Sequence, residues 1–354
     1  MRNAQGEMNT ESADASRLNR RQLLSFRRIR DSNEGARSAA GSWVTVSRPA
    51  MACNFRVIVD SGNRSAVRAA TECLDEVDRL ESILSIFRPS SEASRVNREA
   101  AARPVPVGPE LLELLRLCKR LHEESEGAFD VTTGALTECW GFEERSPRLP
   151  ATGMLASVRE SVGAQLISLG IDDRVSFGSP GVRINLGGVG KGYALDQGAG
   201  KMAAHGIDKA LLSAGYSSVL ALGAGPEGDG WRVGLRHPVH KHKRMASVLL
   251  RSCAMGTSGQ EEQWFEEGGQ RYGHILDPQT GFPPTRVQSV SVMTDSAAWA
   301  DALATAFFVG GPELAERYCS ARDGTVAVML LAHDLSRPIV IGSCNQATVE
   351  VTND

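Results

Sequence analysis

The segment Asn185-Leu-Gly-Gly-Val-Gly-Lys-Gly-Tyr-Ala-Leu-Asp196 places four glycines in the middle of a chain of 354 residues. The apolar run before it, residues 182–186, suits a strand, and the residues from Lys191 onward suit the start of a helix. Glycines between two such elements let a ligand approach the backbone closely. Because a strand, a glycine turn and a helix N-terminus can bind phosphate, the segment is a candidate phosphate-binding loop.

Two common nucleotide-binding motifs do not fit this loop. A Walker loop needs a glycine where Asn185 stands and a Ser or Thr after Lys191, where the chain has Gly192. A dinucleotide fingerprint needs a glycine in place of Tyr193 and a repeated strand-helix pattern before it, which the chain lacks. Both motifs are therefore excluded.

A lone carboxylate further along the chain complements the loop. Asp301 is the only charged residue in the segment 296–310, which has the composition of a helix that is apolar nearly all round. A buried, unpaired carboxylate is costly, so Asp301 should hold a cation or a strong donor. Thr305 lies one turn further on the same face. The pair offers two hard oxygen ligands of the kind that Mg²⁺ or Ca²⁺ prefers, against the alternative of a polar pair on a solvated helix face.

Five blocks of sequence stand in a fixed order around these two features. They are Leu80–Glu92 with Ser94–Asn97, Gly127–Gly134 with Trp140–Phe142, the glycine loop, Thr257–Gly259 with His274–Pro283, and Asp301–Thr305. Together they resemble the signature of the ApbE-type FAD:protein FMN transferases over roughly residues 45–345. One block alone would be weak, but five in order leave little room for coincidence.

The resemblance implies a reaction and its reactants. It implies Mg²⁺-dependent transfer of FMN from FAD to a Ser or Thr hydroxyl of an acceptor protein, with release of AMP. The acceptor is expected to carry a short Ser/Thr flavinylation motif and to be a redox or membrane electron-transport subunit. Two alternatives stay open, namely an FAD pyrophosphatase that gives FMN and AMP, and a non-catalytic FAD-binding protein.

The resemblance also implies roles for individual residues. Asp301, Thr305 and a backbone oxygen of Gly188 correspond to the family's magnesium ligands. His274 corresponds to a residue beside the reacting phosphate and is a candidate proton acceptor, because imidazole titrates near neutral pH. The alternative for His274 is that it caps the turn at Asp277-Pro278. The positions that correspond to flavin contacts are Met51, Phe87, Ala128, Phe129, Asp130, Lys191 and Ile275.

Three positions depart from the family pattern and bear on nucleotide affinity. Asn185 stands where an aspartate is usual and is expected to hydrogen-bond the nucleotide without carrying a charge. Phe87 stands where a tyrosine is usual, so a stacking face is kept and a hydroxyl is lost. Tyr216 stands after Gly215 where a second glycine is common. Trp140-Gly-Phe142 either shelters the ring system or packs a loop.

Composition limits the other function classes. The chain is 42% hydrophobic and 23% charged with a formal net charge of −3, which gives no argument for nucleic acid or an anionic membrane as a partner. Its seven cysteines are scattered and form no CxxC pair. They are expected to be reduced, mostly buried thiols rather than a disulfide framework or a zinc site.

The organisation predicted from the sequence is one large domain with two tails. Residues 1–40 have the composition of a disordered tail, residues 41–345 form the ApbE-like domain, and residues 346–354 form a short tail. Asn19-Arg-Arg-Gln-Leu-Leu24 resembles the start of a twin-arginine export signal, but no apolar stretch follows it. The cytoplasm is therefore favoured, with export as the open alternative.

Strands and helices are mixed without regular alternation, which favours an α+β fold over a doubly wound α/β fold. Helices are expected at 65–86, 109–121, 153–162, 191–205 and 296–310, and strands at 43–46, 55–60, within 217–252, and at 287–293, 325–331 and 339–341. The family resemblance implies mixed sheets and helices in two closely packed lobes with the flavin site between them.

Overall fold

The structure is a computed structural model that describes residues 25–28, 42–240, 242–260 and 263–352. The predicted N-terminal tail therefore lies outside the described residues, except for a short strand, β1 (Ser25–Arg28). The segment that resembles an export signal lies outside them as well.

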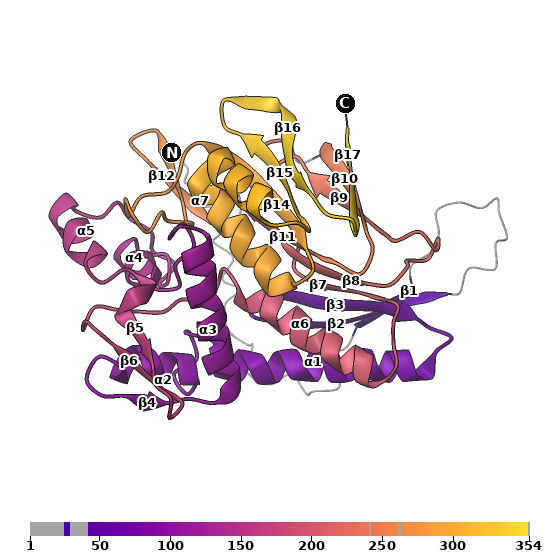
Figure 1. Ribbon diagram of the computed structural model, residues 1–354, viewed down its shortest axis with the longest axis horizontal. Helices are drawn as coiled ribbons and strands as arrows, with labels where there is room; N and C mark the ends of the chain where they lie inside the picture. Colours follow the sequence, from indigo (N-terminus) through magenta and orange to yellow (C-terminus); the bar gives the residue numbers. More distant parts are fainter. Residues whose placement is uncertain (1–24, 29–41, 241, 261–262, 353–354) are drawn as a thin grey trace, which may run out of the picture.

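Within the described ranges, the largest sheet has nine strands, and every neighbouring pair in it is antiparallel. In spatial order its strands are β1, β2 (Trp43–Ala50), β3 (Cys53–Asp60), β7 (Ala210–Ala214), β8 (Ser218–Leu222), β11 (Ala254–Gly259), β14 (Val287–Thr294), β15 (Thr325–Leu331) and β16 (Asp334–Ser343). The sheet draws its strands from both halves of the chain, so segments far apart in sequence meet side by side (Figure 1).

Three long helices pack on one face of this sheet (Figure 1). They are α1 (Arg64–Leu84), α6 (Gly190–Ala204) and α7 (Ala297–Ala321). In α1 the buried apolar residues recur at three and four positions, and the side chain of Asn63 caps the helix by accepting from Ala66 N at 3.2 Å. The main hydrophobic core lies between these helices and the sheet.

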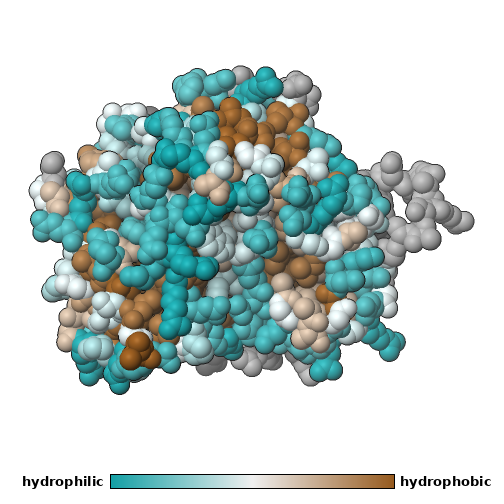
Figure 2. Space-filling model, viewed as in Figure 1, coloured by the Kyte–Doolittle hydropathy of each residue, from teal (hydrophilic) through white to brown (hydrophobic). Residues whose placement is uncertain are grey.

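A smaller sheet covers part of the other face. Its order is β17 (Ala347–Val351), β10 (Arg244–Leu250) and β9 (Trp231–Arg236), and a second apolar cluster lies between it and the large sheet. The molecule therefore has three layers at this end: helices, the large sheet and the small sheet. Polar side chains cover most of the face shown in Figure 2, with apolar patches scattered among them.

The remaining elements gather beside the large sheet, at the left of Figure 1. They are α2 (Glu92–Glu99), α3 (Pro109–Glu124), α4 (Gly134–Cys139), α5 (Thr152–Arg159), a 3₁₀ turn at Ala164–Leu166, a sheet of β4 (Val105–Pro106), β6 (Arg174–Phe177) and β5 (Ile167–Leu169), and the hairpin of β12 (Trp264–Glu267) and β13 (Gln270–Gly273). The α+β class is confirmed, and the two-lobe arrangement stays a prediction.

Two predictions about short segments differ from the structure. Residues 182–186 do not form a strand, since Arg183 makes only an isolated parallel bridge to Thr133. This run leads directly into a loop and has no continuous partner strand, so its apolar side chains are buried without a ladder. The predicted short tail at 346–354 contains β17, whose five residues pair with β10. The domain bounds themselves stay a prediction.

Helix α7 extends beyond the predicted end at Gly310. Gly311 has a φ of 74° inside it, where two helical segments meet, and Pro312 begins the second segment. Glycine adopts this left-handed backbone without strain, and proline suits the first turn of a helix. Within the described part of the chain, no helix combines the length and apolarity that spanning a bilayer requires.

Candidate functional site

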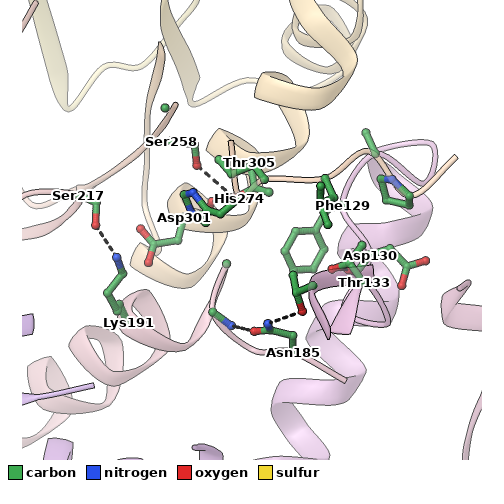
Figure 3. A pocket seen from close by; sticks show the side chains of 18 of the residues that line it. Phe129, Asp130, Thr133, Asn185, Lys191, Ser217, Ser258, His274, Asp301 and Thr305 are labelled. Carbon is green, nitrogen blue, oxygen red and sulfur yellow. Dashed lines mark hydrogen bonds between the residues drawn. The ribbon is translucent and has the colours of Figure 1, made fainter. Parts of the chain in front are cut away.

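A cavity of about 190 Å³ is lined by residues of the large sheet and its helices together with residues of the smaller group of elements. Its walls come from the loop before α4, the glycine loop, the turn before β8, the end of β11, the loop after β13, and α7. Figure 3 shows Lys191 and Asp301 on one side of the cavity, with Phe129 and Thr133 on the other. Six segments separated in sequence thus meet around one space.

Ten of the twelve site residues predicted from the sequence line this cavity. They are Ala128, Phe129, Asp130, Asn185, Gly188, Lys191, His274, Ile275, Asp301 and Thr305. Met51 and Phe87 do not line it. Both adjoin Glu81, which accepts a hydrogen bond from Met51 N at 2.8 Å and pairs with Arg88, the neighbour of Phe87.

Asp301 lies in the first half of α7 and is 7% exposed. Its Oδ2 accepts from Gly192 N at 2.8 Å, and both of its oxygens lie 2.8 Å from Ser218 Oγ. Burial raises the pKa of Asp301 to about 7, while the positive charge of Lys191 and these two hydrogen bonds oppose the rise. The hydrogen bonds to this carboxylate among the described residues thus come from neutral donors.

Close backbone packing sets the position of Asp301. A Cβ atom on Gly192 would lie 2.7 Å from Ala298 N and closer still to the carbonyl of Ala297, and a Cβ on Gly256 would overlap the backbone of Ala300. The lack of a side chain at both glycines lets α6 and β11 press against the first turns of α7. This contact brings the Gly192 amide within hydrogen-bonding range of the carboxylate.

Asp196, the last residue of the glycine segment, holds the start of α7. Its carboxylate accepts from Ser296 Oγ at 2.8 Å, from Ala297 N at 2.8 Å and from Ala298 N at 3.0 Å. The amides of Ala297 and Ala298 are among those that a helix leaves unsatisfied at its N-terminus. Asp196 therefore fixes α7 relative to α6, and no pattern in the sequence marks it for this role.

Thr305 and Gly188 complete a set of hard oxygens beside Asp301. Thr305 Oγ1 donates to Asp301 O at 3.2 Å and lies 3.1 Å from Ser258 Oγ. Gly188 approaches so closely that a Cβ there would lie 3.4 Å from Thr305 Oγ1. A single buried carboxylate with hydroxyl and carbonyl oxygens suits Mg²⁺, which commonly takes one or two carboxylates and completes its shell with water and substrate phosphates.

This donor set does not suit a metal that is held by the protein alone. Among the described residues, no three His, Cys, Asp or Glu side chains are grouped so that they could hold an ion. The residues present therefore fit Mg²⁺ bound together with a phosphate ligand better than a structural metal site.

Lys191 occupies the first turn of α6 and points into the cavity from the glycine loop (Figure 3). Its ammonium group donates to Ser217 Oγ at 2.6 Å rather than to Asp301. Val189, the residue before this turn, makes no side-chain cap, while Gly190 N donates to Leu186 O at 2.7 Å and Gly192 N donates to Asp301 Oδ2 at 2.8 Å. A phosphate here would meet a lysine and a helix N-terminus together.

The Asp130 carboxylate is held by neighbouring residues of the protein. Asp130 belongs to the cavity wall, and its carboxylate accepts from Thr132 N, Thr132 Oγ1, Ala164 N and His122 Nδ1 at 2.6–3.0 Å. The hydrogen bond to Asp130 raises the pKa of His122. The charge of Asp130 thus fastens the loop before α4 to its surroundings, and its contact with the flavin stays a prediction.

Asn185 bridges two walls of the cavity. Its Oδ1 accepts from Gly187 N at 2.8 Å, and its Nδ2 donates to Thr137 Oγ1 at 3.4 Å. Its backbone N–H donates to Val131 O at 2.7 Å. The side-chain amide therefore helps to hold the conformation of the glycine loop. An aspartate could still accept from Gly187 N, but it could not donate to Thr137 as Nδ2 does.

His274 lines the cavity from the loop after β13, and its Nδ1 is 3.2 Å from Gln263 O. A carbonyl can only accept, so Nδ1 carries the hydrogen in the neutral ring and Nε2 is the basic nitrogen. The turn that follows is held by Asp277 itself, which accepts from Gln279 N at 2.8 Å and Thr280 Oγ1 at 2.9 Å.

Trp140 packs the loop that carries His274. It is fully buried, and its Nε1 donates to Gly281 O at 2.9 Å. The neighbouring rings are those of Phe142, Phe265, Tyr272 and Phe282. These contacts favour the loop-packing interpretation of Trp140-Gly-Phe142.

Several cavity residues were not selected from the sequence. Thr133, Thr137 and Ser217 line the space, and Ser218 binds both oxygens of Asp301. Small hydroxyl residues on strands and turns have no spacing that marks them, so only their spatial neighbours identify them.

Comparisons with known proteins agree with this geometry. The model of the ApbE family matches residues 51–330. The chain is 31% identical over 284 residues to the FAD:protein FMN transferase of Klebsiella pneumoniae (strain 342), covering 78% of this chain and 79% of that protein. It is 34% identical over 277 residues to the enzyme of the same name from Treponema pallidum (strain Nichols), covering 74% and 76%.

Solved structures show the same fold. The ApbE protein from Thermotoga maritima superposes with a TM-score of 0.77 at 27% identity, covering 85% of this chain and 97% of that one. The flavin transferase ApbE from Vibrio cholerae gives a TM-score of 0.73 at 28% identity, covering 82% and 93%.

Proposed function

The chain belongs to the ApbE family, and we propose that it transfers FMN from FAD to a Ser or Thr hydroxyl of an acceptor protein, releasing AMP. The observation that carries this proposal is the meeting of Asp301 and Thr305, Lys191 and His274 around one cavity. The names of its relatives support the same reaction, because they describe FAD:protein FMN transferases.

In the proposed reaction the acceptor oxygen attacks the phosphorus nearer the riboflavin. A new phosphorus–oxygen bond forms to the acceptor, the pyrophosphate bond breaks, and AMP leaves with the bridging oxygen. His274 Nε2 takes the hydroxyl proton as the oxygen attacks. Lys191, at the N-terminus of α6, binds the pyrophosphate oxygens.

Asp301, Thr305 and the Gly188 carbonyl are the proposed holders of Mg²⁺, which when bound would offset negative charge on the pyrophosphate. Ser218 and the Gly192 amide orient the Asp301 carboxylate through the hydrogen bonds described above. Phe129, Ala128 and Ile275 provide the apolar part of the cavity wall. Met51 and Phe87 stay proposed flavin contacts outside this cavity.

An acceptor with a Ser/Thr flavinylation motif in a redox or membrane electron-transport complex stays the proposed partner. The cytoplasm stays the proposed compartment. Hydrolysis of FAD to FMN and AMP is the nearest competing activity, since water replaces the acceptor hydroxyl in the same site.

One experiment separates transfer, hydrolysis and simple binding. The purified protein is incubated with FAD and Mg²⁺, with and without an acceptor domain that carries the motif, and AMP, free FMN and flavinylated protein are resolved by chromatography and in-gel fluorescence. Transfer predicts AMP and flavinylated acceptor in equal amounts, and neither in chelator. Free FMN in place of flavinylated acceptor indicates hydrolysis, and unchanged FAD refutes both reactions.

A further inference from the structure

Two cysteines lie together in the apolar cluster between the large and the small sheet. Cys253 stands between β10 and β11 and is fully buried, and Cys344 stands between β16 and β17 and is 6% exposed. All seven cysteines are free thiols in the structure. The catalytic proposal uses none of them.

The β10–β17 pairing brings these two cysteines to the same place. Leu250 pairs with Ala347 at the end of the ladder, and each cysteine lies three residues beyond that pair, in the segment that adjoins its strand. Arg251 N donates to Gln346 O at 2.7 Å, so the two chains stay in contact past the ladder. Directly opposed residues of antiparallel strands have Cα separations within the range that a disulfide bridges.

The side chains meet as the backbone predicts. Both sulfurs contact Gln346: Cys253 Sγ lies 3.3 Å from its carbonyl oxygen, and Cys344 Sγ lies 3.4 Å from its Oε1. The two thiols therefore converge on the same residue, where the two chain segments are already held together by a backbone hydrogen bond.

The two thiols differ in ways that suit nucleophile and resolving partner. The neighbouring Cys253 thiol, with help from the amides of Gln346 and Ala347, lowers the pKa of Cys344. The pKa of Cys253 is raised by the same pairing and by burial. Residues 342, 343, 345 and 346 are exposed, so opening of this short connection would admit a small reagent to Cys344.

We propose that Cys253 and Cys344 are a reversible thiol–disulfide pair that reacts with a low-molecular-weight disulfide and locks the end of β17 onto β10. The Cys344 thiolate attacks the small disulfide, forming a mixed disulfide and expelling one small thiol. The Cys253 sulfur then attacks the Cys344 sulfur and expels the second small thiol. The protein loses two protons and two electrons, and the small disulfide gains them as two thiols.

The test uses the full-length protein and oxidised glutathione as the probe. After incubation, free thiols are alkylated in acid-quenched samples, and the unreduced digest is analysed by mass spectrometry. We expect one linked peptide pair, joined through Cys253 and Cys344 and lighter by two hydrogens, which dithiothreitol reverses. We also expect the oxidised protein to melt roughly 5 °C higher, because the bond closes the long loop from 253 to 344.

Two variants keep the test specific. Cys253→Ser should stop at the mixed disulfide and leave one glutathione on Cys344. Cys319→Ser is the matched control, because Cys319 is half-buried, packs against the main core instead of the second cluster, and has a pKa raised by burial to about 11. It should form the Cys253–Cys344 link as fast as the unaltered protein.

Three results would overturn the proposal. They are no linked peptide in the unaltered protein, glutathionylation of Cys344 in Cys253→Ser that is no faster than that of Cys319, and an oxidised form that melts no higher than the reduced form. The first two refute the reactive pair, and the third refutes the locking of β17.

Discussion

Replacing Gly192 by alanine tests how the position of Asp301 arises. The new methyl group would meet the backbone of Ala297 and Ala298, with the Ala298 nitrogen at 2.7 Å. Backbone atoms at the start of α7 cannot turn aside as a flexible side chain would, because Asp196 holds them with three hydrogen bonds. Helices α6 and α7 would have to move apart.

The expected change in unfolding free energy is compared with that of a control variant in the same helix. Overpacking in a close contact costs about 1–3 kcal/mol of unfolding free energy. Gly200 also lies in α6, but it is exposed and a Cβ there would have no neighbour within 4 Å. Gly200→Ala should stabilise the protein by about 0.5–1 kcal/mol, since glycine is the poorer helix former. The two variants should therefore differ in sign.

Urea denaturation gives the stability of both variants, and Mg²⁺ titration in the presence of FAD gives their metal affinity. Gly192→Ala should lose both stability and Mg²⁺ affinity, because the Gly192 amide that binds Asp301 moves away with α6. Gly200→Ala should keep the unaltered Mg²⁺ affinity. If Gly192→Ala is as stable as Gly200→Ala, the close helix contact does not position the carboxylate and the argument fails.

Three further predictions concern single side chains. Ser218→Ala removes the hydroxyl from both oxygens of Asp301 and should weaken Mg²⁺ affinity by roughly 10- to 100-fold with little change in stability; an unchanged calorimetric titration would contradict the role of Ser218. His274→Asn should leave FAD binding intact and slow FMN transfer by about 10²- to 10⁴-fold, whereas transfer at the original rate and with the original pH profile would rule out His274 as the base. The raised pKa of His122 beside Asp130 predicts that their pairing stabilises the fold fully below the unfolded pKa of about 6.5, and that this stabilisation is lost as the pH rises through the folded pKa. In urea denaturation, His122→Asn should therefore lower the free energy of unfolding more at acid than at alkaline pH. An equal loss at both pH values would refute the linkage.

The competing activities differ only in what reaches the reacting phosphorus. The cavity holds a candidate base and candidate phosphate-binding groups, and these serve water as well as an acceptor hydroxyl. Asn185 does not favour storage of FAD over turnover, since its amide is used to shape the glycine loop. Product analysis with and without acceptor is therefore the decisive measurement.

The periodicity of apolar residues in the sequence was sufficient to predict the long helices. The spacing of apolar residues located α1 to within two residues at its C-terminus, because the apolar face of a surface helix must recur with the helical repeat. The spacing of Asp301 and Thr305 placed both on one face of α7 for the same reason, and the structure has both lining the cavity. Positions on one helix face are set by residues close in sequence, so the local sequence pattern is enough to predict them.

A local sequence pattern could not predict which short segments form strands. Residues 182–186 have the composition of a strand, yet whether they pair depends on what lies beside them, and the structure supplies only one bridge. The same applies to β17, which is a strand because β10 offers it an edge. Strand pairing joins distant segments, and composition alone does not say which partner is present.

The sequence by itself determined the family, the α+β class and most of the residues around the cavity, because glycines, a lone buried carboxylate and ordered motifs are visible along the chain. Only the tertiary structure decided what those residues touch. In it the Asp130 carboxylate accepts hydrogen bonds from His122 and Thr132, and Ser218 hydrogen-bonds Asp301. Cys253 and Cys344 both contact Gln346. These contacts link residues that are distant in sequence or identify which neighbour satisfies a buried polar group, and both depend on how the layers pack.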